Sequence, residues 1–291
     1  MSISFALTPL PPTLYQPAVE NALAEDLGRA GDITSQAVVP AAAQVRVTIR
    51  SRKPGRLAGL DIAAAVFRTV DPELRVTAAI SDGADLQEGT IVATIEGRAR
   101  AVLTAERTAL NFLGHLSGIA TETARIVAAV AGHKAQICCT RKTTPGLRTL
   151  EKYAVRAGGG SNHRFGLDDA ILIKDNHIAV AGGVRPAIAA ARAHAGHMVK
   201  IEVEVDRLDQ LDDALLEGPD IILLDNMTPA LLREAVERTQ GRALLEASGN
   251  VTLQTAPAIA EAGVDLISVG WITHSAPCLD LGLDFEWTDY G

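Results

Sequence analysis

The 291-residue chain lacks several features by which common classes of protein are recognised. Its three cysteines, Cys138, Cys139 and Cys278, have no metal-ligand spacing, and their odd number gives no disulfide framework. No uninterrupted apolar stretch reaches about 18 residues, and the first twenty residues lack the positively charged segment that opens a secretion signal. We therefore expect a soluble, unexported protein with reduced thiols, located in the cytoplasm.

Motifs for several widespread chemistries are also missing. The chain has no Walker A pattern, no Gly-x-Gly-x-x-Gly opening a βαβ unit and no zinc spacing. Its formal net charge of -8 argues against general binding to nucleic acid or to an anionic membrane.

Positive charge is nevertheless concentrated in one segment. Between His133 and Arg164 a single acid, Glu151, accompanies seven cationic residues. These are Lys134, Arg141, Lys142, Arg148, Lys152, Arg156 and Arg164. A basic segment within an acidic chain indicates a small anionic ligand, because a polyanion would be repelled by the rest of the surface.

Six short apolar runs end in charged or small polar residues and are followed by helix-like stretches. They cover residues 136–139, 170–173, 199–205, 221–224, 243–245 and 266–269. Such runs are typical of buried parallel strands in βα units, and the active site of a β/α barrel lies where its strands end. For any single run, the alternative is that the polar residue only terminates the strand. Six strands are fewer than the eight of a full barrel, so we expect an incomplete barrel or a strand hidden in a weak pattern.

The chain before the first of these runs has mixed helical and strand patterns without the polar endings. We assign residues 1–112 to an α+β domain and residues 113–274 to the barrel domain, with 275–291 returning to the first domain. A long helical pattern over 104–131 connects the two, either as one helix or as two helices broken near Gly118.

Cationic residues follow two of the predicted strands. Arg141 and Lys142 stand side by side before a rigid Pro-Gly turn; a guanidinium fork suits a carboxylate or phosphate, and the alternative is a solvated basic loop. Three glycines at 158–160, whose commoner use is a flexible helix C-terminal cap, lead to His163 and Arg164. His163 either contacts the ligand or is structural, and His177 is expected to be a structural hydrogen-bonding residue.

Acidic and glycine-rich strand ends complete the predicted site. Glu204 and Asp225 would hold ribose hydroxyls, or Mg²⁺ through its water shell, unless they simply pair with Arg141 or Lys174. The last loops of such barrels often bind phosphate through backbone N–H groups. The residues in that position are Ser248, Gly249, Asn250 and Gly270.

Taken together, these motifs resemble the quinolinate phosphoribosyltransferase family. The resemblance runs through residues 31–35, 106–111, 140–148, 158–164, 172–177, 202–205, 224–226, 248–250 and 273–275. It implies an N-terminal α/β sandwich followed by an open, incomplete α/β barrel. It further implies a homodimer in which each active site borrows Arg107 from the partner, and Mg²⁺ bound with phosphoribosyl pyrophosphate.

The resemblance also implies residue roles. Arg141, His163, Arg164 and Lys174 would bind the two carboxylates of quinolinate, and Thr140 would also belong to the substrate-binding set. Lys142, Glu204 and Asp225 would attend phosphoribosyl pyrophosphate and its magnesium, with Glu204 and Asp225 as the candidate metal ligands. The catalytic set would be Lys142, Lys174, Glu204 and Asp225, and the 5-phosphate would lie on Ser248, Gly249, Asn250, Val269, Gly270 and Trp271.

Two departures and two alternative functions belong to this prediction. Trp271 stands where the family usually has a small residue, so its ring either narrows the phosphate site or points away. Cys139 stands where an acid is common. The alternatives are a ModD-like paralogue with another substrate and, from residues 81–97, a biotinyl-type carrier module. The hairpin lacks a lysine for cofactor attachment, and the complete cation set favours quinolinate.

Overall fold

A computed structural model describes residues 7–285, which form two compact units. Within the described range, the first unit contains 7–122, 143–159 and 275–285, and the second contains 123–142 and 160–274. Residues 1–6 and 286–291 of the predicted first domain lie outside the described part. The predicted division at residue 112 differs from these units chiefly in the segment 143–159, whose helix packs with the first unit.

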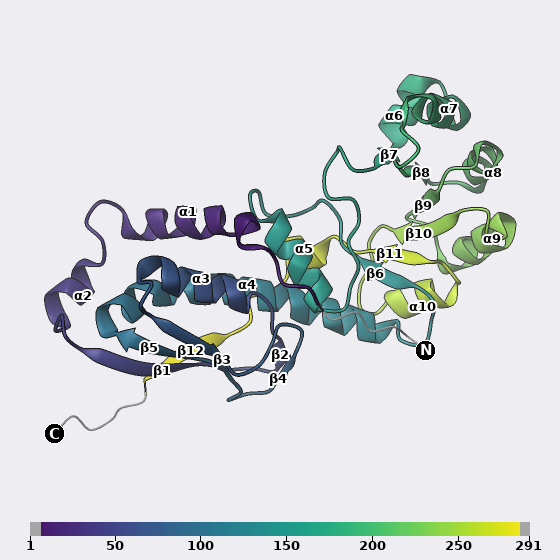
Figure 1. The fold of residues 1–291 in the computed structure, drawn as a ribbon. Helices are drawn as coiled ribbons and strands as arrows, with labels where there is room; N and C mark the ends of the chain where they lie inside the picture. The colour runs from purple at the N-terminus through teal and green to yellow at the C-terminus, as the bar shows by residue number, and fades with distance from the viewer. Residues whose placement is uncertain (1–6, 286–291) are drawn as a thin grey trace. The chain divides into compact units, whose positions relative to one another are not determined.

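The first unit contains a four-stranded antiparallel sheet in the order β12-β1-β5-β3. Its strands are β1 (Gln44–Ser51), β3 (Arg75–Ala78), β5 (Ile91–Arg98) and β12 (Leu281–Phe285), beside a small pair β2 (Gly55–Arg56) and β4 (Asp85–Leu86). The helical elements are η1 (Pro12–Leu14), α1 (Gln16–Leu27), α2 (Ile33–Val38), α3 (Leu60–Val70), most of α4 (Ala99–Ala129) and α5 (Arg148–Ala157). Helices α3 and α4 cover one face of the sheet (Figure 1).

Helix α3 illustrates how the sequence starts an element of this unit. Gly59 adopts φ +94° immediately before it, and the Asp82 carboxylate accepts hydrogen bonds from the backbone N–H groups of Gly59 and Leu60. A carboxylate at this end of a helix satisfies donors that have no partner within the helix and interacts favourably with its dipole. Seven residues of α3 are buried, so the helix supplies much of the apolar core of the unit.

Helix α4 is continuous through Gly118 and is not broken there. A Cβ atom at Gly118 would lie 2.1 Å from the carbonyl oxygen of Pro277. The glycine therefore allows residues 277–279 to cross the helix closely, and the chain continues from this crossing into β12, which pairs with β1. The return of the chain to the first unit depends on the absence of a side chain at this position.

The second unit contains a six-stranded parallel sheet in the order β6-β11-β10-β9-β8-β7. The strands are β6 (Gln136–Cys138), β7 (Ile171–Ile173), β8 (Ile201–Val205), β9 (Ile221–Asp225), β10 (Leu244–Ser248) and β11 (Leu266–Ser268). The helices are α6 (Asp175–Ala181), α7 (Val184–His194), α8 (Leu208–Glu217), α9 (Pro229–Thr239), α10 (Ala256–Glu261) and α11 (Trp271–His274). Among the described residues, β6 and β7 do not pair with each other, which confirms the predicted incomplete barrel.

Parallel pairing places all six strand ends at one edge of this sheet. Strand β9 lies between β8 and β10. Its Asp225 pairs with Ser248 of β10, and its Leu223 pairs with Glu204 of β8. The polar residues that terminate separate apolar runs in the sequence are thereby brought together in space. No helix in the described range is both long enough and apolar enough to cross a membrane.

Candidate active site

A cavity of about 750 Å³ opens at the carboxyl ends of the six strands in the second unit. The predicted residues among its lining are Thr140, Arg141, Lys142, His163, Arg164, Lys174, Glu204, Asp225, Ser248, Gly249, Asn250, Val269, Gly270 and Trp271. The lining also includes Leu172, Leu223, Asn226, Glu246, Val251, Ser268 and His274. Residues more than a hundred positions apart thus share one cavity, as expected for a barrel whose chemistry resides at its strand ends.

Three cations from different loops converge in this cavity. Burial lowers the pKa of the Arg164 guanidinium, and the nearby charge of Arg141 lowers it further. Nη1 of Arg164 donates a 3.0 Å hydrogen bond to the carbonyl oxygen of Ala170, which fixes the direction of the side chain. Lys174 contributes the third positive charge from the end of β7. Such a concentration of like charge favours an anionic ligand that neutralises it.

The two acids predicted for the cavity differ in their contacts. Nζ of Lys174 donates a 2.7 Å hydrogen bond to Oε2 of Glu204, so this lysine and this acid pair directly. Oδ2 of Asp225 accepts from the side-chain amide of Asn226 at 2.7 Å. Glu204 and Asp225 come from β8 and β9, which are neighbouring strands, and both face the same cavity.

The loops after β9 and β10 interlock through a glycine. Gly249 has φ +95°, and a Cβ atom there would lie 2.1 Å from Oδ1 of Asn226. The Asn226 backbone N–H donates to the Ser248 carbonyl at 2.9 Å, and Nδ2 of Asn250 donates to Oδ1 of Asn226 at 3.2 Å. Asn226 and Asn250 also have positive φ values, of 54° and 48°. The two loops therefore form one tightly built rim of the cavity.

Gly270 and its neighbours position Lys142. A Cβ atom at Gly270 would lie 3.0 Å from Cδ of Lys142, so the lysine stem passes against this glycine. The Thr273 hydroxyl donates toward the carbonyl oxygens of Lys142 at 2.8 Å and Gly270 at 3.0 Å. Nε1 of Trp271 donates to the carbonyl oxygen of Val251 at 2.8 Å. The unusual tryptophan thus lines the cavity and fastens the loop after β10 to the loop after β11.

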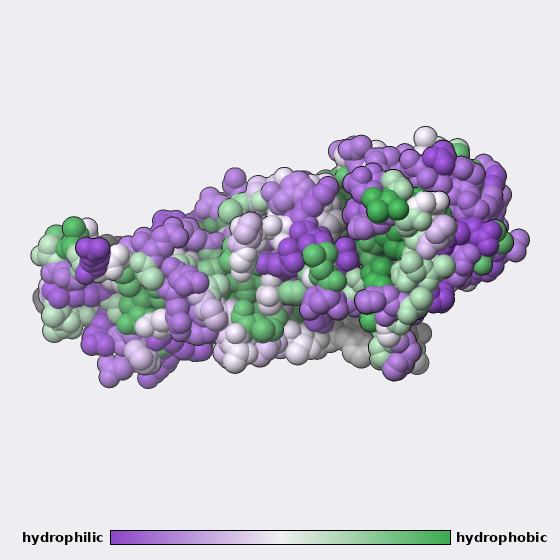
Figure 2. All heavy atoms as spheres, turned by 90° about the horizontal axis from the view of Figure 1, so that it is seen from above, coloured by the Kyte–Doolittle hydropathy of each residue, from purple (hydrophilic) through white to green (hydrophobic). Residues whose placement is uncertain are grey.

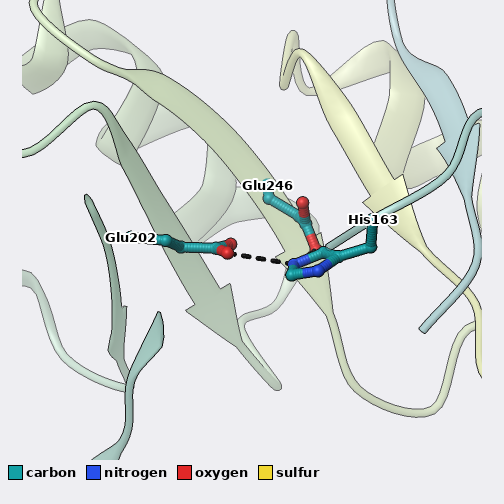
Figure 3. Close-up of side chains that lie close together, drawn as sticks. All are labelled: His163, Glu202 and Glu246. Carbon is teal, nitrogen blue, oxygen red and sulfur yellow. Dashed lines mark ion pairs between the residues drawn. The ribbon is translucent and has the colours of Figure 1, made fainter. Parts of the chain in front are cut away.

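Sequence reasoning missed two acids beside His163. Nε2 of His163 lies 2.9 Å from Oε2 of Glu202 and 3.6 Å from Oε1 of Glu246 (Figure 3). Both acids are almost fully buried, with exposed fractions of 4% for Glu202 and 1% for Glu246. The signal for Glu202 was present, because alternate residues of a strand share a face and Glu204 was already predicted to face the site.

Two other predicted residues lie elsewhere. His177 accepts a 2.9 Å hydrogen bond at Nδ1 from the backbone N–H of Lys174, which confirms its structural role at the start of α6. Arg107 is exposed on α4 in the first unit and does not belong to the lining of this cavity.

Comparison with known proteins agrees with this geometry. Residues 32–117 match the N-terminal domain of quinolinate phosphoribosyl transferase, and residues 119–284 match its C-terminal domain. The chain belongs to the quinolinate phosphoribosyl transferase family. Together the two domain matches include most of the chain and all of the residues predicted for the site.

Individual members of the quinolinate phosphoribosyl transferase family are similar to this chain over nearly their whole length. The carboxylating nicotinate-nucleotide pyrophosphorylase of Mycobacterium leprae is 50% identical over 271 residues, covering 91% of this chain and 95% of the relative. A probable enzyme of the same name from Bacillus subtilis is 45% identical, with 89% of each chain covered. The structure of NadC from Streptococcus pyogenes has a TM-score of 0.92 at 42% identity and covers 96% of this chain and 99% of that one.

Proposed function

We propose that this protein converts quinolinate and phosphoribosyl pyrophosphate to nicotinate mononucleotide, pyrophosphate and CO₂, as a step in de novo NAD biosynthesis. The observation that carries the proposal is the convergence of Arg141, Arg164 and Lys174 in one cavity that also contains acidic and glycine-rich strand ends. The protein is a phosphoribosyltransferase of the quinolinate family, and relatives that carry the name of this activity cover almost all of the chain.

The charge of the cavity suits quinolinate. Carboxyl groups of this kind have pKa values well below 7, so quinolinate is a dianion near neutral pH. The planar guanidinium groups of Arg141 and Arg164 would each engage a carboxylate in a fixed orientation, with Thr140 beside them in the substrate-binding set. Lys174 would exchange its contact with Glu204 for one with the substrate. This exchange frees the Glu204 carboxylate when the dianion binds.

The acids and Lys142 suit the transfer of the phosphoribosyl group. As pyrophosphate departs, the ribose carbon becomes oxocarbenium-like, and the Glu204 and Asp225 carboxylates would stabilise its positive charge. Lys142, held against Gly270, would neutralise the leaving group. Gly249 and Gly270 have no side chains, so the 5-phosphate would approach the backbone N–H groups of the rim closely. Ser248, Asn250, Val269 and Trp271 complete that phosphate site.

Two carboxylates on adjacent strand ends also fit Mg²⁺. This ion is usually held by one or two carboxylates together with substrate phosphates, and Glu204 and Asp225 provide such a pair at the cavity. When bound, Mg²⁺ would supply Lewis-acid neutralisation of the pyrophosphate oxygens.

The remaining chemistry belongs to the substrate. Attack by the ring nitrogen on the ribose carbon gives a cationic pyridinium. Its positive charge stabilises the carbanion left when the adjacent carboxylate departs as CO₂, and a proton then completes the product ring. The protein contributes mainly by positioning the two substrates and balancing their charge.

A homodimer with shared sites is part of the proposal. Arg107 is exposed on α4, where it is available to a second chain. The short helix α2 also exposes apolar side chains, since Ile33 is 66% and Val38 is 71% accessible. Figure 2 shows apolar atoms over α2, and two large apolar side chains exposed on one short helix support a protein contact there.

A cytoplasmic location is supported by the state of the thiols. Cys138, Cys139 and Cys278, all within the described range, form no disulfide, and Cys278 is exposed. Free thiols persist where the redox poise is reducing, whereas oxidising compartments favour disulfides.

A product assay tests the activity. The purified protein is incubated with phosphoribosyl pyrophosphate, Mg²⁺ and either quinolinate or nicotinate. We expect nicotinate mononucleotide, pyrophosphate and CO₂ from quinolinate and no turnover of nicotinate, since the second carboxylate is required by the cation set. Equal turnover of nicotinate, or no product from quinolinate, would overturn the proposal, and the latter result would favour a paralogue with another substrate.

A further inference from the structure

The hydrogen bonds of His163 determine which of its ring nitrogens carries a proton. The backbone N–H of Arg164 donates to Nδ1 of His163 at 2.8 Å, so Nδ1 must be an unprotonated acceptor. The remaining proton is then on Nε2, which faces Oε2 of Glu202 at 2.9 Å. The ring is therefore neutral, and both of its nitrogens are engaged by the protein (Figure 3). A second ring proton, which a cationic His163 would need, has no room at Nδ1.

Glu246 has contacts that suit a carboxylic acid better than a carboxylate. Its side chain is nearly inaccessible, and in the described part of the protein Oε1 of Glu246 is a buried atom without a hydrogen bond. Oε1 of Glu202 is in the same situation, so two carboxylates would place two negative charges together with unsatisfied oxygens. An ionised buried group in such surroundings is costly, and one proton relieves the repulsion between the pair.

The surroundings of Glu246 agree with that assignment. Burial first, and then the charge of Glu202, raise the pKa of the Glu246 carboxyl to about 7. The side chains of Ser268 on β11 and Cys138 on β6 lower the pKa of this carboxyl, but by less than burial and the charge of Glu202 raise it. A charge on His163 would oppose the rise, and the hydrogen bond at Nδ1 removes that charge.

We propose that His163 is a neutral positioning residue, locked between the Glu202 carboxylate and the protonated Glu246 acid, and that quinolinate binding requires Glu246 to keep its proton. His163 accordingly holds the backbone of Arg164, and the dianion is recognised by Arg141, Arg164 and Lys174. The inference rests on the proposed function and deepens it, because it assigns a residue that sets the pH range of substrate binding.

The sign of the pH effect follows from electrostatics. When Glu246 holds its proton, it adds no negative charge to the cavity that it lines. Ionisation of Glu246 adds a negative charge to a cavity that must accept a dianion. If only the protonated form binds, linkage makes the KM for quinolinate rise toward about tenfold per pH unit above the pKa. The guanidinium groups remain charged over this range, and quinolinate is already fully ionised.

A metal ion is the competing occupant of this cluster. One nitrogen of His163 and one oxygen of each acid lie within 4.8 Å of one another. Metal ligation through Nε2 would leave the ring without a proton on either nitrogen, because Nδ1 is occupied as an acceptor. Such a ring would be an anionic imidazolate, whereas histidine ordinarily binds a metal as a neutral imidazole. A proton on Nε2 therefore fits the geometry better than a metal ion.

The test compares Glu246→Gln with the wild type from pH 6 to pH 9. The glutamine is neutral at every pH and has nearly the shape of the protonated acid. We expect the variant to match the wild-type KM for quinolinate within about twofold at pH 6 and to lose the rise above pH 7, while the KM for phosphoribosyl pyrophosphate is unchanged. Glu237→Gln, an exposed substitution on α9, should retain the wild-type profile.

Three outcomes would overturn the inference. The first is an unchanged pH profile in Glu246→Gln, and the second is stoichiometric divalent metal in the purified protein that Glu246→Gln abolishes. The third is read without any substrate: ¹⁵N NMR of the histidine rings, with His163→Gln identifying the signals, should show the neutral Nε2–H form at pH 6. An imidazolium signal would contradict the assignment even if the enzyme turned over quinolinate as proposed. Lack of turnover by the wild type, with the neutral signal present, would instead count against the proposed function alone.

Discussion

At the residue scale, three of the positive charges in the cavity have different fixed environments. Arg164 is oriented by the Ala170 carbonyl, Lys142 passes against Gly270, and Lys174 pairs with Glu204. Pairing Lys174 with an acid limits repulsion among the cations before substrate binds. The dianion must then offer Lys174 a better partner than Glu204, which makes the lysine contact sensitive to the number of substrate carboxylates.

The first prediction concerns Arg141. Arg141→Ala should raise the KM for quinolinate at least tenfold with little change in the KM for phosphoribosyl pyrophosphate, since loss of one cation from a paired site costs about 2–5 kcal/mol. Arg141→Lys should recover part of the loss because it retains the charge but not the guanidinium fork. Steady-state kinetics with each substrate varied separately measures both. Arg233→Ala, an exposed change on α9, is the control. An equal rise in KM in that variant would show that Arg141 does not bind quinolinate and belongs only to a solvated loop.

A second residue-scale prediction uses two glycines with similar backbone angles. Gly249→Ala should raise the KM for phosphoribosyl pyrophosphate, because its Cβ would collide with the Asn226 side chain and open the rim of the phosphate site. Gly182 has φ +84° and open space around it, so Gly182→Ala imposes the backbone strain of about 1–2 kcal/mol without the collision. We expect both variants to unfold at lower temperature, and only Gly249→Ala to lose affinity. Matching kinetic defects in the two variants would show that strain alone accounts for the effect.

At the element scale, the sequence predicted all six strands of the parallel sheet, because each apolar run has a polar ending that marks its end. The same pattern predicted part of the cavity lining, including Arg141, Lys174 and Asp225. Glu202 and Glu246 were not included, although Glu202 lies two residues before Glu204 on the same strand and Glu246 directly follows an apolar run. What the sequence could not show is that both acids meet His163. The partner, His163, lies some forty residues before one acid and some eighty before the other, so only the folded chain reveals the cluster.

The position of segment 143–159 was likewise beyond the sequence pattern. Helix α5 was predicted from its periodicity, but the unit against which it packs depends on buried contacts. Tyr153 donates a 2.7 Å hydrogen bond to Asp82, and His115 contacts Glu151 at 2.9 Å, both within the first unit. Neither contact has a signal in local sequence, because each joins residues more than thirty positions apart.

In helix α4, two effects predict opposite changes in stability for Gly118→Ala. Glycine inside a helix normally costs about 1 kcal/mol relative to alanine, so propensity alone predicts that Gly118→Ala stabilises the protein. The alanine Cβ would instead lie 2.1 Å from the Pro277 carbonyl and displace the crossing that leads into β12. We expect net destabilisation of several kcal/mol, of the size found for overpacking. Urea unfolding measures the change in the free energy of unfolding. Ala128→Gly, on the exposed side of the same helix, serves as the control for helix propensity. A Gly118→Ala variant that is more stable than the wild type would refute the close crossing.

At the scale of the whole molecule, the second unit contains every residue assigned to the substrates except Arg107. The cavity gathers every other residue assigned to the substrates, and Arg107 belongs to the first unit. If each site of a homodimer combines the second unit of one chain with Arg107 of the other, inactive variants of the two kinds should complement each other. A hybrid dimer would then contain one site with both defects and one site with neither.

Mixing experiments test this arrangement. Arg107→Ala and Lys174→Ala should each be nearly inactive, and after subunit exchange an equal mixture should recover up to about a quarter of wild-type activity, because half of the dimers are hybrids with one intact site. Lys174→Ala mixed with Asp225→Ala is the matched control: both changes lie in the second unit, so every site of that hybrid retains a defect and no recovery is expected. Hybrid dimers are counted by native mass spectrometry with one chain isotopically labelled. Abundant hybrids without recovered activity in the first mixture would mean that Arg107 does not serve the partner's site.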